Sequence, residues 1–129
     1  MSINKTFENQ YCRLEIKDDI MYADYKEVVI ALPDAKKMLA DRIMFQQREH
    51  YDCIPLVHHF KAKYVNKAAR KYLGDEGVVG LNASAFIVKT LAAKTLVNIF
   101  LFMEKPKLPI RVFEDELTAV NWIKGFVEK

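Results

Sequence analysis

The stretch "CIPLVHHF" at residues 53–60 decides the fold class. Its apolar residues run almost without interruption up to the His58–His59 pair, whereas a strand with one wet face alternates apolar and polar side chains. An uninterrupted apolar run is typical of a strand covered on both faces, as in the parallel sheets of α/β proteins. Residues 53–60 are therefore predicted to be the central strand.

The segments before this strand predict a hairpin and a helix. "YCRLEIK" (11–17) and "IMYADYK" (20–26) are joined by two aspartates, and the first alternates apolar and charged residues as a half-buried strand does. "LPDAKKMLADRIMFQQREH" (32–50) has Pro33 and Asp34 at its start, where a helix accepts proline and favours an acidic side chain.

The segments after the central strand continue the alternation of helix and strand. A short helix follows Asn66 as N-cap, with Gly74 in the left-handed position that ends it. A strand at 82–89, a helix at 90–104 that ends before Pro106, and a strand at 108–115 come next. Asp115 is the expected N-cap of a last helix.

The predicted order is β-β-α-β-α-β-α-β-α, an α/β fold with a mixed five-stranded sheet packed with helices. The chain of 129 residues has the length of one domain. We predict a polar N-terminal arm at 1–10 and a single domain at 11–129.

Composition excludes several classes of protein. The net charge of +3, from 20 basic and 17 acidic residues, is too small and too evenly spread to predict a nucleic-acid partner. The start of the chain has no apolar stretch, and no apolar run approaches the roughly 20 residues of a membrane span.

The two cysteines, Cys12 and Cys53, are too few for a disulfide framework. We expect them to be buried free thiols, which indicates a cytoplasmic protein.

Three phrases carry a resemblance to a known family. They are "LPDAKKML" (32–39), "NKAARKYL" (66–73) and "NIFLFMEKPKLPIRVFEDELTAVNWI" (98–123). Together with the element order, they make the chain similar to the SpoIIAA-like branch of the STAS domains, and in particular to small stand-alone bacterial STAS-like proteins of uncharacterised function. The likeness covers about residues 11–126, and its motifs are structural, so it implies a fold much more than an activity.

The resemblance does not extend to the phosphorylation switch of the anti-sigma-factor antagonists in that family. Their switch is a Ser or Thr at the start of the helix after the third strand, where added phosphate charge breaks binding to a partner. The equivalent segment here, "HHFKAKYV" (58–65), contains neither residue, and none occurs between Cys53 and Ala83. A Ser/Thr switch is therefore not expected.

The two histidines are the best titratable candidates in the chain. Neighbouring residues on a strand point to opposite faces, so His58 and His59 are not expected to share a metal ion. No nucleophile motif and no phosphate-binding loop accompany them. We predict no metal, no cofactor and no catalytic residue; an enzyme using His58 or His59 as general base would need a carboxylate within hydrogen-bond reach of the imidazole.

Two surfaces are candidates for a partner. The helix at 90–104 has apolar residues opposite the stripe that faces the core, namely Leu91, Leu101 and Phe102. We expect this second apolar surface to be covered by the chain itself, by a protein partner or by a ligand. Lys61 and Lys63 begin a basic cluster that is either a solvated face or a site for an anionic group.

The sequence leads to a non-catalytic STAS-like regulatory or protein-interaction module that acts as a homodimer or through a protein partner. The alternative is a binding protein for a small apolar or anionic, lipid-like ligand. The candidate partner or ligand surface comprises His58, His59, Lys61, Lys63, Leu101 and Phe102.

Overall fold

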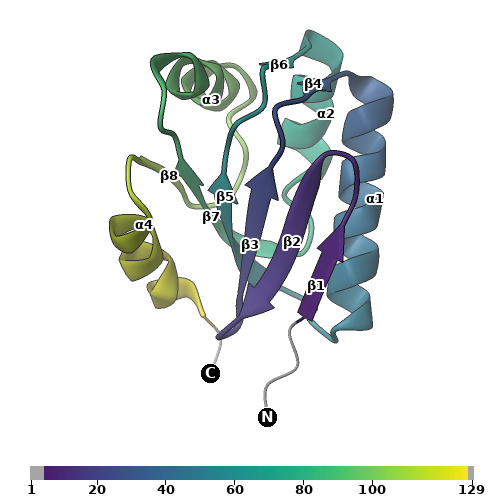
Figure 1. Ribbon diagram of the computed structural model, residues 1–129, viewed down its shortest axis with the longest axis vertical. Helices are drawn as coiled ribbons and strands as arrows, with labels where there is room; N and C mark the ends of the chain where they lie inside the picture. Colours follow the sequence, from purple (N-terminus) through teal and green to yellow (C-terminus); the bar gives the residue numbers. More distant parts are fainter. Residues whose placement is uncertain (1–4, 128–129) are drawn as a thin grey trace.

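The computed structural model describes residues 5–127 and places six strands in one twisted mixed sheet with helices on both faces (Figure 1). In spatial order the strands are β1 (Lys5–Glu8), β2 (Cys12–Lys17), β3 (Ile20–Tyr25), β5 (Ile54–His59), β7 (Leu81–Ile87) and β8 (Ile110–Phe113). The first two pairings, β1–β2 and β2–β3, are antiparallel, and the other three are parallel. The predicted α/β class with a mixed sheet is confirmed, and β5 lies inside the sheet between β3 and β7.

The sheet has one strand more than the five predicted. Part of the segment predicted as an arm, residues 5–8, forms β1 and pairs with residues 13–16 of β2. The segment is polar and short, so it lacks the alternating apolar pattern of a strand, but Phe7 provides an anchor by stacking on Phe45 of the first helix at 6.1 Å between ring centroids. Residues 1–4 of the predicted arm lie outside the described residues.

Four helices cover the sheet unequally. The first three, α1 (Leu32–Arg48), α2 (Lys67–Glu76) and α3 (Leu91–Glu104), lie on one face, and α4 (Glu116–Ile123) lies on the other (Figure 1). A 3₁₀ turn (Lys124–Phe126) follows α4, and a two-stranded parallel pair, β4 (Val29–Ile30) with β6 (Tyr64–Val65), lies beside the main sheet. We call the side under α1, α2 and α3 the cavity face and the other side the α4 face.

Local sequence signals mark the starts of two helices, α2 and α4. The Asn66 and Asp115 side chains accept hydrogen bonds from the backbone N–H groups of Ala69 (2.9 Å) and Thr118 (2.8 Å), as predicted for N-caps. Gly74 was predicted to end α2, and this prediction is wrong, because Gly74 lies buried inside the helix. A Cβ at Gly74 would come within 2.5 Å of the Glu104 Cβ of α3, so close approach of two helices, not a left-handed backbone, requires glycine there.

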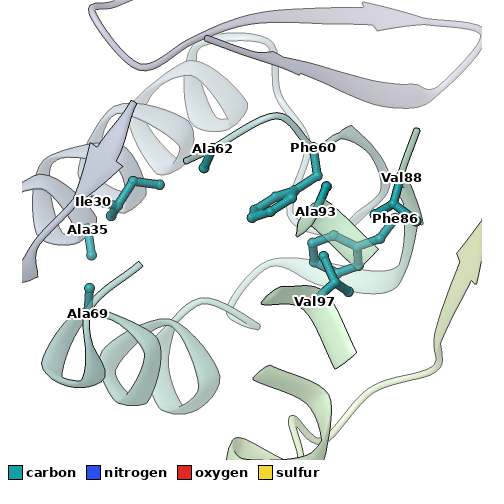
Figure 2. Close-up of a cluster of buried hydrophobic side chains, with 9 residues drawn as sticks. All are labelled: Ile30, Ala35, Phe60, Ala62, Ala69, Phe86, Val88, Ala93 and Val97. Atoms are coloured by element: carbon teal, nitrogen blue, oxygen red, sulfur yellow. The ribbon is translucent and has the colours of Figure 1, made fainter. Parts of the chain in front are cut away.

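Buried side chains on the cavity face include a cluster that joins the sheet to the three helices. Figure 2 shows this cluster, which consists of Ile30, Ala35, Phe60, Ala62, Ala69, Phe86, Val88, Ala93 and Val97. Many of its members are small, and the two large rings lie at the end near Val97 (Figure 2). Small side chains between the layers leave room that larger ones would fill.

The two cysteines differ in exposure. Cys12 is buried on β2, and Cys53 is exposed just before β5. The prediction of two buried thiols is therefore wrong for Cys53, because the buried strand begins one residue later, at Ile54. No helix among residues 5–127 is long and apolar enough to cross a membrane.

Candidate functional site

The alternation of β5 separates the two histidines. His58 is 8 % exposed and lies on the cavity face, whereas His59 lies on the α4 face and is half-buried. The two rings therefore belong to different sites and do not converge on one ion, as the strand geometry predicts. Within residues 5–127, no group of three His, Cys, Asp or Glu side chains is placed to hold a metal.

A cavity of about 360 Å³ lies between the cavity face and helices α1, α2 and α3. Its walls are mainly aliphatic and aromatic, with side chains such as Leu56, Phe86 and Val97. Ligand pockets commonly measure about 300–1,000 Å³ and are lined in this way, with few polar groups. The cavity thus has the size and lining of a site for a small molecule.

Three polar side chains form a hydrogen-bonded row in the cavity lining. His58 Nδ1 lies 3.0 Å from the Tyr25 hydroxyl, and His58 Nε2 lies 3.3 Å from the Ser84 hydroxyl. The strands set this arrangement, because β3, β5 and β7 are neighbours and each places one of these residues on the cavity face. The His58 ring also stacks on Phe86, with ring centroids 4.0 Å apart and planes 9° apart.

The imidazole of His58 is held neutral. Burial, followed by the nearby positive charge of Arg42, lowers the pKa of His58 from 6.5 to about 3. Burial also raises the pKa of the Tyr25 hydroxyl well above its usual value, and raises that of the Cys12 thiol to about 11. The row therefore consists of neutral groups that hydrogen-bond and do not ionise near neutral pH.

Arg42 is the other buried polar residue of the cavity. It is 6 % exposed on α1 and donates to Gln46 Oε1 at 2.9 Å and to the carbonyls of Gly77 and Val79 at 3.1 and 2.8 Å. All three acceptors are neutral, and burial lowers the pKa of its guanidinium to about 10. Arg42 thus ties α1 to the loop after α2 and places a positive charge in the wall of the cavity.

A second, polar hollow lies on the α4 face. His59 Nε2 is 2.8 Å from Glu116 Oε1, and the hollow of about 290 Å³ is otherwise lined by Arg13, Glu15, Lys17, Tyr22 and Asp24. A carboxylate is thus within reach of an imidazole, which is the feature expected of a His general base. The Glu116 side chain is 58 % exposed, however, and the described lining offers neither Ser nor Cys as a nucleophile.

The remaining candidate surface residues do not gather at one place. Lys61 pairs with Asp24 at 3.1 Å, and Lys61 and Lys63 line neither the cavity nor the polar hollow. Leu101 packs, half-buried, against the core cluster of the cavity face, whereas Phe102 is 75 % exposed. Of the six residues predicted as a partner or ligand surface, only His58 lines the cavity.

Three residues of the cavity wall were not among those predicted from the sequence: Tyr25, Arg42 and Ser84. Arg42 and Ser84 had a detectable signal, because each is a polar residue at a position where the apolar period predicts burial. Tyr25 had none, because an aromatic residue fits the apolar period of its strand. Arg42 lies three residues after Leu39 and three before Phe45 on the buried stripe of α1, and Ser84 lies between Ala83 and Ala85 in an apolar strand. Buried polar residues of this kind mark either a structural hydrogen bond or a site.

The model of a domain of unknown function, DUF7793, matches residues 14–127, and the chain belongs to this family. No curated protein matches the chain.

The fold also has a solved counterpart. The chain is similar in structure to an uncharacterised protein of the DUF3478 family with a SpoIIAA-like fold, from Shewanella loihica PV-4. The TM-score is 0.57 at 13% sequence identity, and the match covers 95% of this chain and 97% of the other. The fold of this DUF7793 protein is therefore SpoIIAA-like, as the sequence resemblance implied.

Proposed function

We propose that this protein is a non-catalytic binding module whose cavity holds a small, mostly apolar molecule. The observation that carries the proposal is the 360 Å³ cavity between the sheet and three helices, with a predominantly apolar lining. A cavity of roughly 150 Å³ lined by Leu, Ile and Phe is enough to hold benzene, so this one has room for a larger ligand. The proposal follows the ligand-binding alternative from the sequence, with its site at the cavity and not at the lysines.

The chemistry of the cavity favours binding over catalysis. A general base works best with a pKa near the operating pH, and the pKa of His58 is far below that range. Both of its ring nitrogens already have partners in Tyr25 and Ser84.

The two free thiols are typical of proteins in a reducing compartment, and we place the protein in the cytoplasm.

A neutral fluorescent probe tests binding in the cavity. N-phenyl-1-naphthylamine should bind the wild-type chain with a large rise in emission, because its rings enter an apolar, water-poor site. The substitution Val97→Phe adds volume at a buried position of the lining and should weaken binding about tenfold or more.

The matched control is Val120→Phe, which adds the same volume on α4, outside the cavity lining. It should leave the affinity unchanged, and circular dichroism should show both variants folded. Equal affinity of the wild type and a folded Val97→Phe variant, or no binding by the wild type, would contradict the proposal.

A second candidate function, contact with a second copy of the chain, is favoured by α3. Leu91, Ile99, Phe102 and Met103 on this helix are 80, 42, 75 and 55 % exposed. Large apolar side chains gathered on one helix are a common feature of protein contact surfaces. Because of this exposed apolar surface, the homodimer predicted from the sequence remains part of the proposal.

Sedimentation velocity tests the contact. The wild type should shift toward a dimer as its concentration rises, and Phe102→Ser should sediment as a monomer. Leu117→Ser removes a comparably exposed side chain, 73 % exposed on α4, and should behave as the wild type. A wild type that stays monomeric at every concentration would exclude the dimer.

A further inference from the structure

The charged side chains in the described cavity wall are all basic. Arg42 and Arg70 are its charged residues, and no Asp or Glu is among the described lining residues. Arg70 is neutralised by Glu104, with Nε and Oε2 2.7 Å apart. Arg42 has no carboxylate within salt-bridge distance among residues 5–127, so its charge lacks a counter-ion there.

Arg42 also has donor capacity to spare. A guanidinium carries five N–H groups, and the structure records three hydrogen bonds from this one. A buried charge without a counter-ion is costly, and a negative group hydrogen-bonded beside it would offset part of that cost. Arg42 therefore favours an anion over a neutral ligand in the cavity.

The row of Tyr25, His58 and Ser84 has one donor hydrogen left over as well. The two hydroxyls and the neutral imidazole carry three such hydrogens and share two hydrogen bonds. Whichever tautomer His58 adopts, one hydroxyl hydrogen at an end of the row remains for another acceptor. No further acceptor is recorded for either hydroxyl among the described residues.

We propose that the ligand is an amphiphilic carboxylate, whose negative head lies beside Arg42 and accepts from the free hydroxyl of the Tyr25–His58–Ser84 row while its apolar body fills the cavity. This inference rests on the binding function proposed above and specifies the chemistry of the ligand. The donors of the wall exceed its acceptors, so the ligand must supply acceptors and negative charge. The body must be apolar because aliphatic and aromatic side chains form most of the remaining wall.

The test compares octanoate with 1-octanol, which share a chain but differ in charge. Each displaces N-phenyl-1-naphthylamine from the full wild-type chain near neutral pH, and octanoate should bind about tenfold to a hundredfold more tightly, as expected for a hydrogen-bonded charge. Arg42→Gln should reduce octanoate affinity by a similar factor and change octanol affinity less than twofold. Arg48→Gln, the same substitution at an exposed arginine of α1 outside the cavity lining, should leave both unchanged.

The outcomes separate this inference from the binding function itself. If octanol binds as tightly as octanoate, the cavity binds apolar molecules but the carboxylate inference is wrong. If both alkyl ligands and the naphthylamine fail to bind, both proposals are wrong. The comparison of the two ligands on the wild-type protein decides the matter even if Arg42→Gln does not fold.

Discussion

At the scale of single residues, the molecule is organised around polar side chains that are buried among apolar ones. His58 is the clearest case, because it lies in the middle of the sheet and both of its ring nitrogens have hydroxyl partners. Burial and the charge of Arg42 favour the neutral ring, and stacking on Phe86 fixes its plane. The result is a rigid polar row that can orient a ligand without changing its own charge.

The neutral ring of His58 predicts a specific dependence of stability on pH. The folded protein keeps this ring unprotonated down to about pH 3, whereas the unfolded chain binds a proton near pH 6.5. The unfolded state therefore takes up more protons between these values, and the free energy of unfolding should fall as the pH falls, by at most about 1.4 kcal/mol per pH unit from this residue. Urea unfolding of the wild type and His58→Gln between pH 7 and 5 measures the difference in slope.

The comparison needs a control variant that removes an exposed histidine in place of the buried His58. His50 is exposed and lies outside the cavity lining, with a positive φ of 66° that Asn tolerates, so His50→Asn serves as the control for removing a histidine. His58→Gln should show the flatter profile. Equal slopes for the wild type and His58→Gln would mean that His58 titrates alike in the folded and unfolded chains.

At the scale of elements, the contact between α2 and α3 joins two helices that both contribute to the cavity wall. The contact depends on Gly74, over which Glu104 packs, and on the ion pair between Arg70 and Glu104. Glu104 is the last residue of α3, so the pair fixes that end of the helix over α2.

Gly74→Ala should therefore destabilise the protein, although alanine is the better helix former by about 1 kcal/mol. The new Cβ would lie 2.5 Å from the Glu104 Cβ, which is too close to the backbone to move freely, so the two helices must separate. We expect a net loss of about 1–3 kcal/mol in chemical denaturation, as for other overpacked sites. Gly125→Ala, with nothing within 4 Å of the new Cβ, should change stability by less than about 0.5 kcal/mol.

The elements also show what the sequence can and cannot predict. The apolar run of β5, the alternation of β2 and the N-caps of α2 and α4 are local signals, and the structure agrees with them. β1 was missed because its pairing with β2 is a tertiary contact made by a polar segment. The role of Gly74 was missed for the same reason, because its close neighbour lies 30 residues away along the chain, at Glu104.

At the scale of the whole molecule, the sheet separates two environments. The cavity face carries the apolar cavity and its buried polar row, and the α4 face carries the polar hollow with His59 and Glu116. The sequence predicted that the two histidines would face apart, but it could not predict a cavity, because its walls come from seven strands and three helices. Only the packed fold brings Tyr25, Arg42 and Ser84 into one wall.

The most direct test of the central claim locates a bound ligand by methyl NMR. N-phenyl-1-naphthylamine, titrated into the full chain, should shift the methyl signals of residues in the cavity wall, such as Leu56 and Val97, because its aromatic rings lie against them. The methyls of Val57 and Ile123, buried on the α4 face, should stay in place. Shifts confined to the α4 face or to the exposed side of α3, with the cavity methyls unmoved, would contradict a binding site between the sheet and its three helices.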